Sequence, residues 1–475
     1  MDENRGYRLG LRLLTVLVGI ALLGVSARPR AADLALQGAR RAWESGNPLE
    51  ASRQLARAAE HFPWRSDLWE LAGVYAVQGG AQRQALFYLA QAAARGPLSP
   101  AGQIARGDAY QALGDLPAAI TAWQAALPAA QAHPRLAQAY RQQGRYTEAL
   151  ENLQALLITQ PSDAAAYYQA GLLLAALRPE SCIAYLTRAA ELNPSLAATA
   201  SEMERRIRTA RLADEPAYTF MSTGRVLASL GEWDLAAEAF RQAVALRPDY
   251  AEAWAYWGEA RQHTTPGADA NGLILADLEK AHQLAPHSLA ANLFLALYWR
   301  RQGNYEQAFV YLNTAAQAEP TNPVVQVEMG NTRSEQGDLL AAQAHFLRAL
   351  ELAPEEVVYW RILAQFSLQH QIQIRQLALY AARQAVTLAP QDPISLDLMG
   401  YTLLLLEDYA NAERFLRRAL AANPNYALAH LHLGQVYLFT GDSQRAHDHL
   451  LIAQALAPST PTADLAQRLL QRYFP

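Results

Sequence analysis

Four histidines near the C-terminal end of the chain are the residues whose type best fits metal chemistry. They form two pairs, His430 with His432 and His447 with His449, and the members of each pair are two positions apart. Two imidazoles that bind one metal from a single helix are expected at i and i+4, so that both rings point the same way. A spacing of two points them about 200° apart. The pattern therefore favours packing and surface histidines over a metal site.

The other residues with reactive or charged side chains carry no recognisable chemistry. Cys182 is the only cysteine, which excludes a disulfide framework within the chain and a cysteine-based metal site. No phosphate-binding loop, nucleophile elbow, zinc-protease motif or dinucleotide-binding glycine turn occurs in the sequence. We therefore predict no catalytic residue, no cofactor and no metal site, and expect that the protein is not an enzyme.

A basic cluster in the middle of the chain has the charge to bind an anion. It consists of Arg205, Arg206, Arg208 and Arg211. Glu202 and Glu204 precede two of these arginines by four residues, which is the spacing and the order that stabilise a helix through ion pairs. We therefore interpret the cluster as a solvated, ion-paired helix face.

Small residues and prolines recur at a fixed spacing through most of the chain, which indicates the elements that must position any site. The clearest copy spans residues 322–355 and carries Gly330, Gly337, Ala342, Phe346, Ala349 and Pro354. Apolar residues with helical spacing on both sides of Gly337 predict two helices joined by a turn. Glycine allows the turn and proline ends the second helix. Near-copies about 34 residues long recur from the thirties to Pro458, and we count twelve of them.

This combination of positions resembles the tetratricopeptide repeat family. Two further copies carry it clearly, one with Gly231, Ala236, Phe240, Ala243 and Pro248, the other with Gly434, Tyr437, Gly441, Ala446, Ala453 and Pro458. The resemblance implies an all-α, right-handed solenoid of helix hairpins. One hairpin cannot bury its apolar faces alone, so neighbouring hairpins are expected to stack.

The repeat period divides the chain into segments. Residues 32–195 hold about five repeats and residues 217–460 about seven. Between them, residues 196–216 lack glycine and are predicted to form a connecting helix that separates two sub-arrays. Residues 461–475 have the pattern of an amphipathic helix, which would cap the apolar face of the last repeat.

Residues 1–31 have a membrane-targeting pattern. Three arginines precede the uncharged run from Leu13 to Ala27, and two more follow it. The run is short for a spanning helix of ~20 residues, and it ends in small residues like those of a signal-peptide cleavage site. We expect an uncleaved transmembrane anchor, with a cleaved signal peptide as the alternative. The solenoid is then expected outside the cytoplasm, either anchored to the membrane or secreted or periplasmic.

The resemblance also implies a candidate groove. In the family, the first helices of successive repeats line the concave face and carry ligand contacts. With Gly330 at position 8, positions 5, 6, 9 and 12 of these helices mix charged, amide and aromatic groups, as a peptide-binding groove does; an ordinary solvated helix face is the alternative. The candidate protein-binding residues are Arg225, Tyr256, Glu259, Arg300, Asn331, Arg361, Gln365, Asp397, Tyr401, His432 and Gln435.

Together these patterns predict a membrane-anchored scaffold or adaptor of bacterial type that binds one or more proteins or peptides. The net charge of −4 gives no general attraction for nucleic acid. A recognition or assembly subunit of an envelope polysaccharide or secretion enzyme is the alternative function. Self-association through apolar first-helix residues such as Leu404 and Phe439 is a further alternative.

Overall fold

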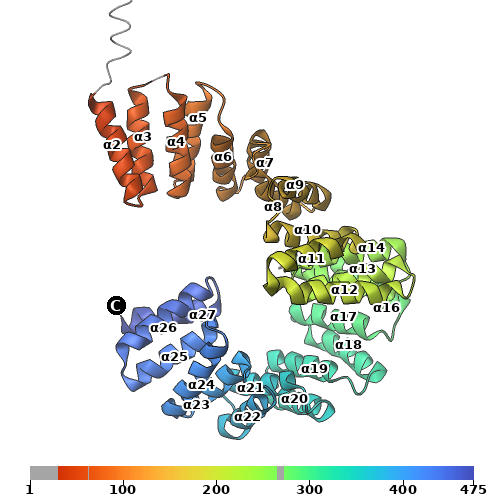
Figure 1. Cartoon of the computed structure of the whole chain (residues 1–475). Coiled ribbons are helices and arrows are strands. Elements are labelled where there is room, and N and C mark those ends of the chain that lie inside the picture. The colour runs from red at the N-terminus through yellow and green to blue at the C-terminus, as the bar shows by residue number, and fades with distance from the viewer. Residues whose placement is uncertain (1–29, 63, 265–271, 475) are drawn as a thin grey trace, which may run out of the picture. The chain divides into compact units, whose positions relative to one another are not determined.

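The computed structural model describes residues 30–62, 64–264 and 272–474, and within these ranges it consists of helices joined by turns (Figure 1). The helices pair into twelve hairpins, the number that the repeat count predicted. The predicted all-α solenoid of helix hairpins is confirmed. The chain divides into two compact units, the first ending at Leu246 and the second beginning at Arg247.

The first unit contains six of the hairpins and one additional helix. The hairpins are α2 (Arg30–Glu44) with α3 (Pro48–Glu60), α4 (Ser66–Gln78) with α5 (Gln82–Ala93), α6 (Pro100–Ala112) with α7 (Leu116–Ala125), α8 (Ala132–Gln142) with α9 (Tyr146–Thr159), α10 (Ala164–Leu177) with α11 (Pro179–Leu192), and α13 (Pro216–Ser229) with α14 (Trp233–Leu246). The additional helix, α12 (Ala197–Arg211), follows a short 3-10 turn at Pro194–Leu196.

The second unit contains the other six hairpins and a terminal helix. The hairpins are α15 (Ala251–Thr264) with α16 (Leu273–Leu284), α17 (Leu289–Arg301) with α18 (Tyr305–Ala318), α19 (Pro323–Gln336) with α20 (Leu339–Leu352), α21 (Val357–Gln369) with α22 (Leu379–Leu388), α23 (Pro393–Leu405) with α24 (Tyr409–Ala422), and α25 (Ala427–Thr440) with α26 (Ser443–Leu456). A π-helical turn, Ile374–Ala378, precedes α22, and α27 (Pro461–Tyr473) ends the chain.

In two hairpins of the second unit, the turn between the helices is built from a glycine followed by an aspartate. Gly337 has a φ of 91°, a left-handed conformation that favours glycine and ends α19. Asp338 then caps α20, because its Oδ1 accepts a hydrogen bond from the backbone N–H of Ala341 at 3.1 Å. Gly441 and Asp442 repeat the arrangement between α25 and α26.

The two helices of a hairpin cross where a glycine faces a large apolar side chain. A Cβ added to Gly330 would lie 2.6 Å from Cε1 of Phe346, which is closer than real side-chain contacts. Gly107 faces Trp123 and Gly224 faces Phe240 in the same way. The missing side chain therefore lets the helices approach closely enough for the aromatic ring to fill the core.

A second recurring contact ties a first helix to the loop that directly precedes it. In four repeats of the second unit, the side chain at position 4 of the first helix donates an N–H to the carbonyl oxygen of the proline six residues earlier. The N···O distances are 2.8 to 3.0 Å. The donors are Trp254, Asn292, Trp360 and His430. Three different residue types thus donate to the equivalent proline carbonyl in different repeats. Without this donor, the carbonyl would lose its hydrogen bond to water when the helices pack over it.

The predicted connecting helix is present as α12, but the units do not divide there. Its face carries the predicted ion pairs, Glu202 with Arg206 at 2.7 Å and Glu204 with Arg208. The boundary follows α14 because the hairpin α13–α14 packs against α10 and its turn contacts α8. The first unit therefore contains the five hairpins that precede α12, α12 itself and the hairpin that follows it.

A half-buried set of ion pairs links the α13–α14 turn to α8. Arg141, at the end of α8, donates from Nε and Nη2 to the two carboxylate oxygens of Asp234 at 2.7 and 2.6 Å, and also pairs with Glu232. The hydroxyl of Tyr146 donates to the backbone carbonyl of Asp234 at 3.2 Å. Burial, reinforced by the Asp234 carboxylate, raises the pKa of Tyr146 to about 12. The two partners of Arg141 lie more than ninety residues along the chain, so this contact goes beyond nearest-neighbour stacking.

The C-terminal helix covers the last hairpin. Leu465, Leu469 and Leu470 of α27 pack against Leu431 and Leu450. The opposite side of α27 exposes polar residues, among them Asp464, Gln467, Arg468 and Gln471. This is the distribution that a terminal cap requires.

Residues 1–29, which hold most of the predicted anchor or signal segment, lie outside the described residues. In the part of the chain that the structure describes, none of the helices combines the length and the apolar character that crossing a membrane needs.

The helix crossing can be tested with Gly330→Ala. We expect the added methyl group to push against Phe346 and to lower the free energy of unfolding by about 1–3 kcal/mol, measured by urea unfolding followed by circular dichroism. Gly38→Ala is the matched control, because its nearest neighbour is the flexible end of Gln54 at 3.3 Å. In that helix alanine is expected to be neutral or stabilising. Equal effects of the two substitutions would contradict the crossing argument.

Candidate functional site

The predicted groove residues lie on the first helices of the hairpins, as the resemblance implied. Arg225 is exposed on α13 in the first unit, and the other ten lie in the second unit. Those ten are Tyr256 and Glu259 on α15, Arg300 on α17, Asn331 on α19, Arg361 and Gln365 on α21, Asp397 and Tyr401 on α23, and His432 and Gln435 on α25.

Several of these charged side chains pair with the next first helix along the array. Arg300 on α17 pairs with Glu328 on α19. Arg361 on α21 reaches Asp392, the N-cap of α23, at 2.9 Å and donates to the Ser395 hydroxyl at 3.1 Å. The charges at these positions therefore hold neighbouring repeats together.

Glu259 is buried in a similar contact. Its carboxylate accepts hydrogen bonds from Arg301 on α17 at 2.8 Å and from His263 on its own helix at 3.0 Å. Burial opposes ionisation, but these two bonds outweigh it and hold the pKa of Glu259 below its usual range. A carboxylate of this kind stabilises the stack and is closed to a ligand in this structure.

Asp397, His432 and Tyr401 form a compact cluster between α23 and α25. Asp397 is only 2% exposed and its Oδ1 accepts from Nδ1 of His432 at 2.9 Å. The His432 ring stacks on Tyr401 with a centroid distance of 4.1 Å and an interplanar angle of 9°. Burial, with a contribution from Asp397, raises the pKa of Tyr401. Asp397 and His432 are buried because each satisfies the other, whereas Tyr401 keeps one partly exposed edge.

Of the remaining histidines of the C-terminal group, His430 and His449 contact each other and His447 lies apart from them against Phe474. His430 must carry its proton on Nε2, because that nitrogen faces the Pro424 carbonyl at 3.0 Å. Its Nδ1 then accepts from Nδ1 of His449 at 2.8 Å, while His447 lies edge-on to Phe474. Across residues 30–62, 64–264 and 272–474, no group of three histidine, cysteine, aspartate or glutamate residues is placed to hold a metal ion.

Cys182 lies in the core of the first unit. It is fully buried, and burial raises the pKa of its thiol to about 12. A thiol in such surroundings is not a nucleophile at neutral pH.

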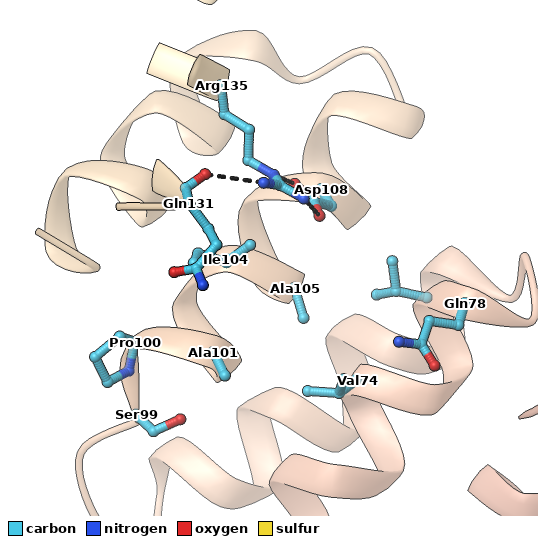
Figure 2. A pocket seen from close by; sticks show the side chains of 11 residues that line it. Val74, Gln78, Ser99, Pro100, Ala101, Ile104, Ala105, Asp108, Gln131 and Arg135 are labelled. Carbon is cyan, nitrogen blue, oxygen red and sulfur yellow. Dashed lines mark hydrogen bonds and ion pairs between the residues drawn. The ribbon is translucent and has the colours of Figure 1, made fainter. Parts of the chain in front are cut away.

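A hollow lies in the first unit, which contains only one of the predicted groove residues, Arg225. It has a volume of about 560 Å³ and lies on the first helices α4, α6 and α8 of three successive hairpins (Figure 2). Its lining is Val74, Val77, Gln78, Ser99, Pro100, Ala101, Ile104, Ala105, Asp108, Gln131 and Arg135.

The repeat frame contains the signal that could have found this hollow. With Gly107 at position 8, Ile104, Ala105 and Asp108 occupy positions 5, 6 and 9, the same positions that defined the predicted groove in the second half. The candidate groove was drawn from residues 225–435, so the aliphatic residues at these positions of α4 and α6 were not among its members. The small side chains of Ala101 and Ala105 leave the space open. Only the packed structure shows this space, because residues of neighbouring helices form its other walls.

One end of the hollow is closed by an ion pair. Arg135 on α8 donates from Nε and Nη2 to Asp108 on α6 at 2.6 and 3.0 Å, and from Nη1 to the Gln131 carbonyl at 2.8 Å (Figure 2). Asp108 also accepts from the indole N–H of Trp123 at 3.0 Å. The pair is held by three helices and forms a rigid polar wall.

Comparison with family models identifies the repeats. Models described as "Tetratricopeptide repeat" match residues 300–366, 403–472 and 135–197, and a model described as "TPR repeat" matches residues 224–263. Together these segments make up about half of the chain. The chain belongs to the tetratricopeptide repeat family. No curated protein sequence shows significant similarity to it.

A search of solved structures also finds matches to this chain. A chain of the APC/C Cut9–Hcn1 hetero-tetramer is 15% identical, with 99% of this chain and 95% of that one covered and a TM-score of 0.43. Yeast Tom70 is 15% identical, with coverages of 94% and 96% and a TM-score of 0.45. PilF of Pseudomonas aeruginosa is 20% identical, with coverages of 47% and 99% and a TM-score of 0.38.

Two histidines in the tetratricopeptide repeats of the second unit predict a pH-dependent stability. Burial, with a contribution from Arg333, lowers the pKa of His345, and burial together with His430 lowers the pKa of His449. The unfolded chain binds these protons near pH 6.5, whereas the folded chain binds them only at lower pH. The free energy of unfolding should therefore be highest above about pH 6.5, where both histidines are neutral in either state. It should fall as the pH drops below that value, because the unfolded chain then binds more protons.

The measurement is urea unfolding between about pH 7.5 and about pH 5.5. The double variant His345→Gln and His449→Gln should show a flatter dependence than the native chain, because glutamine does not titrate. His61→Gln, at the exposed C-cap of α3, serves as the control. An unchanged slope in the double variant would show that these histidines do not carry the effect.

Proposed function

We propose that this protein is a scaffold that binds a partner protein or peptide along the inner face made by the first helices of its hairpins, with no catalysis of its own. The observation that carries the proposal is the hollow of about 560 Å³ on three successive first helices. Its size lies within the range of pockets that bury a ligand, ~300–1,000 Å³.

The first helices of the second unit support the same proposal in a different way. Their ion pairs and the Asp397–His432 contact fix the position of each helix against the next. Side chains beside these pairs, such as Gln365, are exposed. A partner would therefore meet a surface whose shape is already set, which reduces the entropy lost on binding.

We further propose that residues 1–31 anchor the array to a membrane and place it outside the cytoplasm. The uncharged run from Leu13 to Ala27 and its flanking arginines support this proposal. An anchor of this kind would concentrate the binding surface at the membrane, where its partner would be found.

Site-specific photocrosslinking in cells tests the binding surface. A photoreactive residue replaces Gln78 or Gln365, which are exposed on first helices, or Arg83 or Gln283, which are exposed on second helices. We expect discrete crosslinked proteins from one or both first-helix positions and none from the second-helix positions. The same crosslinks from all four sites, or crosslinks from second helices alone, would overturn the proposal.

Carbonate extraction of membranes, with mass spectrometry of the N-terminus, tests the anchor. The full-length chain should remain in the membrane pellet with residues 1–31 attached. Val18→Arg should release it, because an arginine at the centre of a spanning helix costs about 2.5–3.5 kcal/mol, while Val18→Leu should not. A native chain that is soluble and begins after Ala27 would establish the cleaved signal instead.

A further inference from the structure

We infer that the hollow in the first unit binds an extended, uncharged peptide segment through its aliphatic side chains. The inference rests on the proposed binding function and specifies the partner's chemistry at one site. It is carried by three properties of the lining: an aliphatic floor, charges that are already neutralised, and amide groups on facing walls.

Both helices that form the floor of the hollow, α4 and α6, contribute aliphatic side chains. Val74 and Val77 contribute from α4, and Ile104 contributes from α6 (Figure 2). Ala101 and Ala105 open the space, because their side chains end at Cβ. Apolar groups that enter this space gain about 25 cal/mol for each Å² that they remove from water.

The charged residues that line the hollow are already satisfied within the protein. Asp108 accepts from Arg135 and Trp123, and Arg135 also binds the Gln131 carbonyl. At the opposite end, Ser99 lines the hollow, and its backbone N–H and hydroxyl already donate to Glu70, which lies outside the lining. A charged ligand side chain or a terminal carboxylate would lose its hydration without gaining an opposite charge, so an uncharged segment fits best.

Glutamine side chains stand on facing walls of the hollow. Gln78 lies on α4 and Gln131 lies just before α8, and both are exposed (Figure 2). A primary amide donates and accepts hydrogen bonds, which is what a peptide backbone requires. An extended segment presents backbone N–H and C=O groups along both edges, whereas a helix uses these groups internally. The two amides therefore favour an extended ligand over a helical one.

An aromatic surface continues the apolar floor along α4. Leu71, Tyr75 and Gln78 share one face of the helix at i, i+4 and i+7. Trp43 of α2 stacks on Tyr75 with a centroid distance of 4.2 Å and is still 43% exposed. Leu71 is 39% exposed. Side chains of the ligand that leave the hollow in this direction would therefore also meet apolar surface.

The test is a titration of the full-length chain with fluorescent peptides that have blocked ends. The first peptide alternates leucine and serine, and variants replace the leucines with glutamate or lysine. A further peptide has the same length and the same number of leucines, now at helical spacing, with alanine in place of serine. We expect the alternating leucine peptide to bind at least tenfold more tightly than each of the others.

Ala101→Phe locates the site. Ala101 is exposed at the start of α6, so the larger ring fills the hollow without entering the core, and binding of the leucine peptide should weaken at least tenfold. Ala344→Phe, at an exposed position of α20, is the matched control and should bind as the native chain does. Circular dichroism establishes that both variants are folded.

Three results would overturn the inference. Undiminished binding to Ala101→Phe would place the peptide elsewhere. Equal or tighter binding of a charged peptide would contradict the argument from paired charges. Preference for the helical peptide would contradict the extended conformation. If any of these occurs while crosslinking from first helices succeeds, the scaffold function stands and only the ligand class is wrong.

Discussion

The close crossing of two helices within each hairpin is the constraint on which the rest of the structure depends. At Gly330, Gly224 and Gly107 a large ring occupies the place where a Cβ would be, so each pair of helices is held at short distance around its own core. A hairpin made this way buries only one side. The other side becomes the surface that packs on the next hairpin, and repetition of this step builds each unit.

Contacts between hairpins then decide what the first helices can offer to a partner. In the second unit, charged and aromatic groups at the expected groove positions are largely used to bind the neighbouring helix, as Arg361 and His432 show. In the first unit, small and aliphatic residues at the corresponding positions leave an open hollow. The same repeat positions thus form a polar surface in the second unit, where the side chains bind each other, and an apolar hollow in the first unit.

Much of the architecture was predictable because it depends on local signals. The twelve hairpins, their turn glycines, the α12 ion pairs and the final amphipathic helix follow from spacing along the chain, and the structure contains each of them. The boundary between the units was not predictable in this way. The α13–α14 hairpin belongs to the first unit, where it packs against α10 and where Arg141 of α8 binds Asp234 and Glu232, and no local pattern links residues so far apart.

The sequence by itself determined the repeat, the family and the faces of the helices, because periodicity of apolar and small residues is a property of the chain alone. Tertiary structure decided which residues on those faces remain open. Glu259 and Asp397 were expected at a groove and are buried, since each accepts a hydrogen bond from a partner on the next hairpin. Ala101 and Ala105 carry no sequence signal of a binding site. The space beside them exists because larger side chains of neighbouring helices surround it. A cavity is defined by neighbours from several hairpins, and only packing brings those neighbours together.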